Sequence, residues 1–334
     1  MIRTCAKCGF ILGTRPGLLE KDGVCQACIN SENKKHIDFK EKQEWLTQYI
    51  KQNKTHKKYD CVIGVSGGKD SHMIVAKLME RHGVSNPLLV TVCDEFTMTE
   101  AGRHNRDNIS RHFSLDHIIF RYSPEDFKRN TLYDFEKTLH PLKWIEEKLY
   151  LTPFEVAKNF GIKLVFMGED PAYEYGSSTE LKMFDNLTND EVKVLYFGAF
   201  YPYSNTESYN VAKQHGFLDL DDCFEWYRSG SCDRYAQIDS IGYIVHHWCK
   251  FPKFGFQRVS DMACRFVREG ILSREQAVEL IKDRDYQLDG KAKADFCRLL
   301  SISTEYMNGV IEKHANSSLV YKDSNGFFRR NDYR

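Results

Sequence analysis

An alternation of short apolar runs and helical segments between residues 59 and 200 constrains the fold more than any other feature of the sequence. Short apolar runs are typical of buried strands, and the intervening segments carry apolar residues at helical spacing. Strands joined by helices form right-handed crossovers, which build a parallel sheet. The expected strands cover residues 59–65, 87–94, 115–122, 161–169 and 191–200. The sequence therefore predicts an α/β fold with a Rossmann-like, doubly wound parallel sheet.

The helix before the fourth strand carries its own boundary signals. Thr152 would be the N-cap, Pro153 would take the first helical position, and Glu155 would complete a capping box. Gly161 follows the expected end. We therefore expect this helix to begin at Pro153.

Beyond about residue 260 the strand pattern stops and helical stretches follow. Ser273 and Gln276 predict a capping box at the start of one helix, and residues 303–314 predict another. The basic and aromatic segment 324–334 is expected to be a loose tail. The C-terminal region is thus predicted to be helical.

Two C-x2-C pairs, 16 residues apart, predict a zinc ribbon near the start of the chain. Each pair can present two thiolates to one tetrahedral Zn²⁺, and four thiolates leave the ion no open position. We therefore expect a structural zinc bound by Cys5, Cys8, Cys25 and Cys28. Five further cysteines that stand in apolar stretches are interpreted as small core residues: Cys61, Cys93, Cys249, Cys264 and Cys297.

The charge balance argues against nucleic acid as a partner. Lys plus Arg and Asp plus Glu number 47 each, so the chain has no global positive field. Residues 31–58 do carry eight lysines against four acids on a helical pattern, which indicates a connecting helix with a solvated face or, alternatively, an RNA-contacting patch. No apolar run approaches about 20 residues, and the first residues lack an apolar core, so we expect a cytoplasmic protein without a membrane partner.

The segment "GVSGGKDS", residues 64–71, follows the first expected strand. Ligands of parallel sheets sit beyond the carboxyl ends of the strands, and a glycine-rich turn before a helix can bind phosphate through backbone N–H groups. The segment is not a Walker loop, because Asp70 follows Lys69 where that motif requires Ser or Thr. A carboxylate there would repel phosphate unless Mg²⁺ lay between them. The loop therefore predicts metal-bound pyrophosphate, and a plain tight turn is the alternative.

This segment resembles the pyrophosphatase (PP) loop of the ATP pyrophosphatase superfamily, which includes GMP synthetase, asparagine synthetase and tRNA thiolases. Its members cleave ATP between the α and β phosphates, adenylate an oxygen, and let a nitrogen or sulfur nucleophile displace AMP. The resemblance implies that Lys69, Asp70 and Glu169 are catalytic. It also implies that the loop residues bind pyrophosphate: Ser66, Gly67, Gly68, Lys69, Asp70 and Ser71. Asp94 and Glu95, at the end of the second expected strand, would lie near adenosine. Ordinary acids at a strand end are the alternative for those two.

A closer resemblance covers most of the chain. In kind and order, several motifs of the chain are similar to those of the bacterial N-acetyl sugar amidotransferase family, which serves O-antigen and nonulosonic-acid pathways. These motifs are the cysteine pairs, the loop, "GEDPAYEYG", "YPYSNTESYNVAKQHGF", "GSCDRYAQIDSIGYIVHHWCKFPKFGFQR" and "SDMACRFVREG". The resemblance implies that an acetamido group on a sugar becomes an acetamidino group while ATP, with Mg²⁺, becomes AMP and pyrophosphate. It implies four parts: a zinc ribbon (1–34), a basic helical linker (35–58), the PP-loop domain (59–258) and a helical C-terminal region (259–334).

Residues after the fourth expected strand are candidates for binding the sugar. Glu169 and Asp170 would face the loop as ligands of a metal or a hydroxyl, although Asp170 could instead cap a helix. Tyr173 and Tyr175 could stack on a sugar or a base, or simply pack in the interior.

A basic and aromatic stretch further along the chain is a second candidate. Lys253 and Arg258 would suit a sugar that carries a carboxylate or a nucleotide diphosphate, with solvated lysines on a folded loop as the alternative. His246 and His247 are placed on a strand, where neighbouring side chains point to opposite faces, so a shared metal ion is not expected.

The chain lacks the signals of an internal glutaminase. The nearest match to a G-x-C-x-G elbow, around Cys232, has only the first glycine, and Ile2 stands where an amino-terminal nucleophile would be. We therefore expect a separate glutaminase subunit similar to that of imidazole glycerol phosphate synthase. The expected substrate is an N-acetylated sugar, either free or linked to UDP or CMP.

Two other functions compete with this interpretation. A tRNA thiolase or other tRNA-modifying enzyme would also join a zinc ribbon to this loop, but the zero net charge and the lack of further C-x-x-C pairs argue against it. A non-catalytic scaffold would have no use for the Lys69, Asp70 and Ser71 set.

Overall fold

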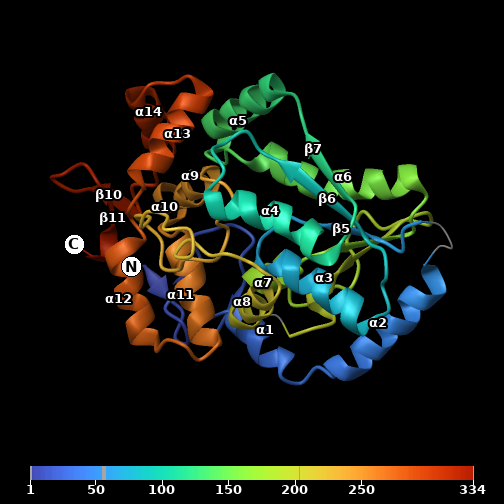
Figure 1. The fold of residues 1–334 in the computed structure, drawn as a ribbon. Helices are drawn as coiled ribbons and strands as arrows, with labels where there is room; N and C mark the ends of the chain where they lie inside the picture. Colours follow the sequence, from blue (N-terminus) through green and yellow to red (C-terminus); the bar gives the residue numbers. More distant parts are fainter. Residues whose placement is uncertain (1, 55–57, 203, 334) are drawn as a thin grey trace.

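The computed structural model describes residues 2–54, 58–202 and 204–333. The expected linker, the motif from residue 201 to 217 and the expected tail therefore each contain positions outside the described residues, namely 55–57, 203 and 334. The centre of the protein is a five-stranded parallel sheet (Figure 1). The strands are β5 (Val62–Gly64), β6 (Leu88–Cys93), β7 (His117–Arg121), β8 (Leu164–Met167) and β9 (Lys193–Tyr196). The α/β prediction and all five expected strands are confirmed.

The strand order, β7-β6-β5-β8-β9, creates a switch point in the middle of the sheet. From β5 the chain first builds outward through β6 and β7, and then returns to place β8 on the other side of β5. The loops after β5 and β8 consequently diverge and leave a crevice, where ligands of open α/β sheets bind. The segment from residue 64 to 71 begins at this crevice.

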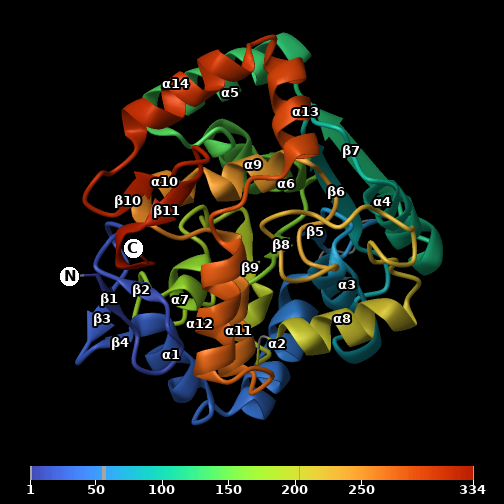
Figure 2. The same cartoon turned by 90° about the vertical axis from the view of Figure 1, so that its left-hand side faces the viewer.

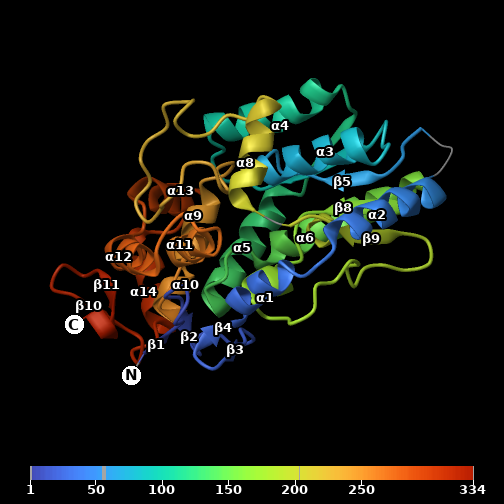
Figure 3. The same ribbon diagram turned by 90° about the horizontal axis from the view of Figure 1, so that it is seen from below.

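Helices cover both faces of the sheet because alternate strand residues enter two separate cores. Ile63, Leu89 and Phe166 pack with α2, α3 and α4, whereas Val62, Val90 and Val165 pack with α6. Figure 3 shows α3, α4 and α8 lying together on one side of the strands. The helices of this part are α2 (Phe39–Asn53), α3 (Lys69–Arg81), α4 (Glu100–Phe113), α5 (Pro124–Thr138), α6 (Lys143–Phe160), α7 (Pro171–Tyr175) and α8 (Asn205–Gln214), with a 3-10 turn η1 at Phe197–Ala199.

The predicted start of the helix before β8 is wrong. That helix, α6, begins ten residues earlier, at Lys143, and Pro153 lies inside it. Thr152 is buried and its hydroxyl pairs with Tyr122 Oη at 2.8 Å, so it does not cap the helix. Pro153 lies against the end of β5, close to Gly64. Tertiary packing of the proline ring therefore outweighs its local tendency to begin a helix.

The N-terminal segment folds over two helices from the far end of the chain. It consists of two short hairpins and a helix: β1 (Arg3–Thr4), β2 (Ile11–Leu12), β3 (Glu20–Lys21), β4 (Val24–Cys25) and α1 (Gln26–Lys34). Its buried side chains share a core with Val259, Ala263 and Ala277 of α11 and α12, beside which it lies in Figure 2. The ribbon is thus part of the main body of the protein.

The chain after residue 258 is mainly helical, as predicted, and contains α11 (Arg258–Arg268), α12 (Arg274–Arg284), α13 (Gly290–Leu300) and α14 (Thr304–His314). Two helices, α9 (Gly242–Trp248) and α10 (Lys250–Phe254), precede this region where a strand and a loop were expected. The capping box of Ser273 and Gln276 is present at the start of α12. In Figure 1, α13 and α14 lie against α5, with which they share a core.

The expected loose tail is instead a short hairpin, which corrects that prediction. It pairs β10 (Val320–Lys322) with β11 (Phe328–Arg330) and ends in a 3-10 turn η2 (Asn331–Tyr333). Arg330 is only 2% exposed and forms an ion pair with Asp332. The apolar residues of the tail cover Trp248 and Phe251, which explains why a basic segment is ordered.

Among the helices of the described residues, we find none that is both long and apolar enough to cross a membrane.

Candidate functional site at the edge of the sheet

The loop after β5 is held in a compact turn by its own side chains. The backbone N–H of Ser66 donates to Ser71 Oγ at 3.0 Å, and that of Gly68 donates to Ser66 Oγ at 3.2 Å. Gly67 has φ +88°, and a Cβ atom there would lie 2.6 Å from the backbone nitrogen of Arg106 on α4. Only glycine fits this position, so the loop packs tightly between β5 and α4.

Lys69 and Asp70 open helix α3 at the mouth of this turn. Lys69 is only 4% exposed, and its Nζ donates to both carboxylate oxygens of Asp70, at 2.9 and 2.8 Å. The surrounding protein opposes ionisation of Asp70, but Lys69 outweighs this effect, and with Ser208 and Arg265 it holds the pKa of Asp70 below its ordinary value. Asp70 therefore stays a carboxylate at neutral pH.

Glu169 faces Asp70 from the end of β8. Burial raises the pKa of Glu169, and the negative charge of Asp70 raises it further, while Arg265 and Lys69 act in the opposite direction. A Cβ atom at Gly198 would lie 3.0 Å from Glu169 Cα, so a larger residue there would crowd the backbone of Glu169. Two neighbouring carboxyl groups, of which Asp70 raises the pKa of Glu169, are an arrangement that a divalent cation would relieve.

Arg265 on α11 completes this group and was missed in the sequence. It is 6% exposed, its charge acts on both Asp70 and Glu169, and its guanidinium lies 4.9 Å from the centre of the Tyr175 ring. A weak signal was present, since Asp261 and Arg265 stand four residues apart on one helical face, with the apolar Met262, Ala263 and Cys264 between them in the sequence. We refer to Lys69, Asp70, Glu169 and Arg265 as the sheet-edge site.

Cavities flank the sheet-edge site on several sides. One is lined by Asp70, Glu169 and Ser208. Another lies between the ribbon and α11 and is lined by Tyr175 and Arg265, among others. Arg265 therefore lies between the loop after β5 and a cavity whose opposite wall is the ribbon.

The acids that follow β6 lie at the same edge of the sheet. Asp94 Oδ1 accepts hydrogen bonds from the backbone N–H of Phe96 at 2.8 Å and from Ser240 Oγ at 3.0 Å. Burial raises the pKa of Asp94 to about 7, with a further contribution from Asp239. Glu95 forms an ion pair with Arg121 at 3.3 Å. Their expected proximity to adenosine stays a prediction.

Two of the expected sugar-binding residues have structural partners. Asp170 is the N-cap of α7, and its two oxygens accept from three backbone N–H groups, including those of Ala172 and Lys182 at 3.0 Å. Tyr173 is 2% exposed, and its hydroxyl donates to the carbonyl oxygen of Asn30 on α1. Both side chains fasten α7 within the structure, which accords with the structural alternatives open for them.

The other three expected sugar-binding residues separate in space. Tyr175 lines the cavity between the ribbon and α11. Arg258 is close enough for its charge to interact with Tyr175. Within the described residues, Nε of Arg258 has no hydrogen-bond partner. Lys253 instead donates to the carbonyl oxygen of Thr138 at 2.8 Å, and burial lowers the pKa of its ammonium to about 8. The structure thus places Tyr175 and Arg258, but not Lys253, near Arg265.

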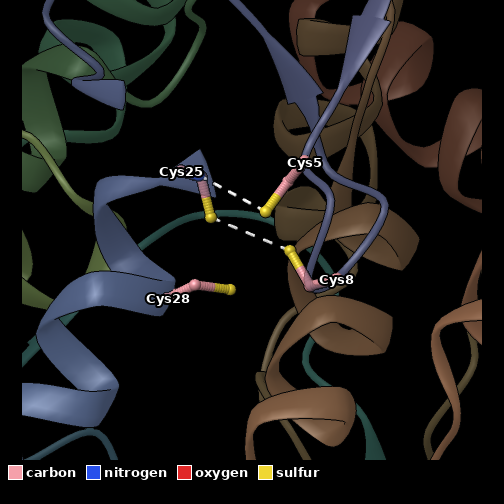
Figure 4. A group of neighbouring side chains, drawn as sticks. All are labelled: Cys5, Cys8, Cys25 and Cys28. Atoms are coloured by element: carbon pink, nitrogen blue, oxygen red, sulfur yellow. Dashed lines mark hydrogen bonds between the residues drawn. The ribbon is translucent and has the colours of Figure 1, made fainter. Parts of the chain in front are cut away.

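The four cysteines of the ribbon converge on one point (Figure 4). Their sulfur atoms lie within 4.8 Å of one another, and those of Cys8 and Cys25 are 3.7 Å apart. Tetrahedral Zn²⁺ with Zn–S bonds of about 2.3 Å would hold sulfur atoms about 3.8 Å apart. All four side chains are buried, so this four-cysteine cluster fits a closed zinc site. The five cysteines expected in the core are buried as well.

The placement of His246 and His247 on a strand is wrong, because both lie on α9. His247 pairs with Gln237 at 2.7 Å, whereas His246 faces Glu146 at 3.1 Å. The two rings still diverge, but the strand argument against a metal ion at His246 no longer applies.

Comparison with known proteins identifies one domain in this chain. Residues 225–332 match the family described as "LPS biosynthesis protein WbpG-like, C-terminal domain". A curated relative, "Uncharacterized protein MJ1599" of Methanocaldococcus jannaschii, is 24% identical over 220 residues, which are 66% of this chain and 71% of that protein. Among solved structures, the NH3-dependent NAD synthetase of Campylobacter jejuni is similar over 83% of this chain and 95% of its own, at 12% identity and a TM-score of 0.38.

Proposed function

We propose that this WbpG-like chain is an AMP-forming amidotransferase of lipopolysaccharide sugar biosynthesis, which converts an acetamido group into an acetamidino group. One observation carries the proposal. The phosphate-type loop at the switch point meets Glu169 and Arg265, and Arg265 belongs to the segment that matches the WbpG-like domain. The part of the chain similar to a sugar-pathway family thereby supplies a cation to the nucleotide loop.

ATP would bind with its pyrophosphate end on the loop. Backbone N–H groups of the turn and the positive end of α3 suit phosphate oxygens, and Lys69 would shift from Asp70 toward the leaving pyrophosphate. Asp70 and Glu169 would hold Mg²⁺, which would offset the charge of the triphosphate. Lys69 and Arg265 would help to keep Asp70 ionised and would oppose protonation of Glu169.

The proposed chemistry uses ATP to remove the amide oxygen. A resonance-stabilised amide does not release its oxygen to ammonia, so the oxygen first attacks the α-phosphorus and pyrophosphate leaves. Ammonia then adds to the adenylated carbon, and the added nitrogen loses a proton. The tetrahedral intermediate expels AMP, which carries the former amide oxygen. The sum is acetamide plus ATP plus ammonia giving acetamidine, AMP and pyrophosphate.

The cavity between the ribbon and α11 is the proposed position of the acceptor sugar. It offers aromatic and cationic groups, Tyr175, Arg265 and Arg268, next to the sheet-edge site. Arginine binds planar carboxylates and phosphates in a bidentate manner, and tyrosine can stack on a sugar ring. This lining supports an acidic sugar or one linked to a nucleotide diphosphate such as UDP, or to CMP. The ribbon, with its structural zinc, would form the outer wall.

Ammonia would come from a separate glutaminase subunit. A glutaminase nucleophile must be a thiolate, but burial raises the pKa of Cys232, the residue nearest to an elbow motif. Burial likewise raises the pKa of Cys223, the other cysteine that is only half buried. The charges of Arg258 and Arg284 act on Cys232 but do not outweigh burial, and Cys223 lies among acids, which supports a partner of the type that serves imidazole glycerol phosphate synthase.

The test combines the purified chain with ATP, Mg²⁺ and UDP-linked 2,3-diacetamido uronic acids or free nonulosonic acids. Ammonium should support AMP formation and a mass change of the acceptor that corresponds to replacing O by NH, whereas glutamine alone should not. Asp70→Asn should lose both products, and Asp126→Asn, an exposed acid on α5, should retain them.

Three results would contradict the proposal. Formation of ADP in place of AMP would exclude α–β cleavage, and turnover with glutamine alone would exclude the partner. Salt-dependent binding of tRNA together with tRNA-dependent AMP formation would favour the thiolase alternative.

A further inference from the structure

A cluster of two histidines and a glutamate stands apart from both the ribbon and the sheet-edge site. His140 lies in the turn between α5 and α6, Glu146 lies in the first turn of α6, and His246 lies on α9. Figure 2 shows α9 crossing beside α6. We call these three residues the His–Glu–His cluster.

The ligand atoms of the three side chains point to one place. His140 Nε2 lies 2.9 Å from Glu146 Oε2, and His246 Nε2 lies 3.1 Å from Glu146 Oε1. The two imidazole rings are tilted by 34° with their centres 4.9 Å apart, and all the ligand atoms fall within 4.8 Å of one another. Around Zn²⁺ with bonds of 2.0 to 2.1 Å, neighbouring ligand atoms would lie about 3.3 Å apart. Small side-chain movements would therefore admit an ion.

The hydrogen bonds of the metal-free trio use the same atoms that would bind the ion. Nε2 of His140 and Nε2 of His246 each donate to a different oxygen of Glu146. A histidine ligand must present a bare nitrogen, so a bound ion would take the place of these two protons. The Glu146 carboxylate would then be the third ligand. Lys250, whose charge acts on His246, is paired with Asp261.

The cluster is open on one side. The side chains of His140 and Glu146 are 37% and 35% exposed, whereas that of His246 is 9% exposed. Two imidazoles and one carboxylate are the protein ligands of zinc sites that keep a fourth position for water or substrate. The four-cysteine cluster lacks such a position because all its ligands are thiolates and are buried.

The His–Glu–His cluster lies at the carboxyl edge of the sheet, as does the loop after β5. A helix that precedes a parallel strand begins at the carboxyl edge of the sheet, so the first turn of α6 is at that edge. Tyr150, one turn beyond Glu146, is influenced by the charges of both Glu146 and Glu169. An ion bound there would therefore be a neighbour of the sheet-edge site.

We propose that His140, Glu146 and His246 bind a second divalent transition-metal ion of the zinc type, with one coordination position open to solvent. This inference does not depend on the proposed function. A metal-free trio joined by hydrogen bonds is the competing arrangement, and the two differ in metal content.

The test is the zinc content of the full chain after equilibration with Zn²⁺ and removal of loosely bound ions. The wild type should hold two equivalents, and X-ray absorption should show both Zn–S bonds of about 2.3 Å and Zn–N/O bonds of about 2.0 to 2.1 Å. His246→Ala should hold one equivalent with sulfur ligands only. His247→Ala, its neighbour on α9 outside the cluster, should still hold two.

Glu146→Gln provides the second variant, because it preserves the shape and hydrogen-bonding capacity of the side chain. It should weaken zinc binding at this site by at least about 100-fold. The melting temperature of the protein should be nearly unchanged when the His–Glu–His cluster holds no ion. A single zinc equivalent with only sulfur ligands in the folded wild type would overturn the proposal, as would two equivalents in a folded His246→Ala.

Discussion

The four-cysteine cluster and the sheet-edge site are built in opposite ways. The four cysteines come from 24 consecutive residues, are buried, and converge in a closed arrangement. The sheet-edge site draws Asp70, Glu169 and Arg265 from three distant segments and is flanked by cavities. A closed cluster stabilises the fold and leaves no room for chemistry, whereas an open group of charges costs stability and can bind a ligand.

Helix α11 connects the two regions. Cys264 donates to the carbonyl oxygen of Cys8 at 3.3 Å, and its neighbour Arg265 reaches toward Asp70. The ribbon thus supports the helix that carries the cation of the sheet-edge site. Mutations in the two regions should consequently have distinct effects on stability but a shared effect on activity.

The largest effect is expected from Cys8→Ser in the closed cluster. Loss of a structural metal belongs to the few changes that cost more than about 4 kcal/mol of unfolding free energy. Zinc bound to sulfur should be lost, the melting temperature should fall steeply, and activity should disappear with it. Cys223→Ser, a half-buried cysteine outside the cluster, should stay within about 1 kcal/mol of the wild type in chemical denaturation. A stable Cys8→Ser protein without zinc would remove the structural role from the ribbon.

Asp70→Asn should have the opposite profile. AMP formation should fall by about 10²-fold to 10³-fold, because the loop would lose a metal ligand and the charge that positions Lys69. Sulfur-bound zinc and the unfolding transition should be nearly unchanged, since Asn keeps an acceptor for the buried ammonium. Rate and melting temperature measured on the same preparation separate the two effects, and a residual rate above a tenth of the wild type would contradict the role of Asp70.

Arg265→Lys should reduce kcat/KM for the acceptor by about 10-fold to 100-fold. Lysine keeps the positive charge but cannot form the planar, bidentate contact of a guanidinium or lie over the Tyr175 ring in the same way. The KM for ATP should change less than the KM for the acceptor. Arg268→Lys, on the same helix and lining the same cavity, is the matched comparison. Equal losses in the two variants would show that the cavity as a whole, and not Arg265, determines acceptor binding.

The smallest effect concerns pH and Asp94. An unfolded aspartate releases its proton near pH 3.8, whereas burial and Asp239 raise the pKa of Asp94 in the fold to about 7. Between these values the folded state binds more protons, so its stability falls as the pH rises, and the full penalty is present above about pH 7. With about 1.4 kcal/mol per unit and partial relaxation, we expect a loss of about 2 kcal/mol.

Asp94→Asn should remove this contribution. Urea denaturation at pH 5 and pH 8 should show a smaller loss of stability in the variant than in the wild type. An identical pH dependence in the two proteins would mean that Asp94 is ionised throughout the range.

The sequence predicted the features that depend on local patterns. The five strands, the cysteine cluster and the capping box at Ser273 each follow from neighbouring residues. The start of α6 was wrong because the packing of Pro153 against β5 is a long-range contact. The C-terminal hairpin was missed for the same reason, since its apolar residues are ordered only by contact with Trp248 and Phe251.

The candidate site could be predicted only in part. Asp70 and Glu169 follow strands, so the carboxyl edge of a parallel sheet brings them together. Arg265 and the His–Glu–His cluster depend on how the C-terminal helices dock, which no local pattern specifies. Asp170 and Tyr173 lie in the expected segment, but their side chains point into the structure as a helix cap and a buried contact.

The most direct measurement follows the amide oxygen. An acceptor labelled with ¹⁸O in its acetamido carbonyl would be incubated with the chain, ATP, Mg²⁺ and ammonium, and the nucleotide products would be analysed by mass spectrometry. The account predicts that the label appears in AMP, one atom for each acetamidino group formed. Label in inorganic phosphate or pyrophosphate, or an acceptor that keeps its oxygen while AMP accumulates, would contradict it.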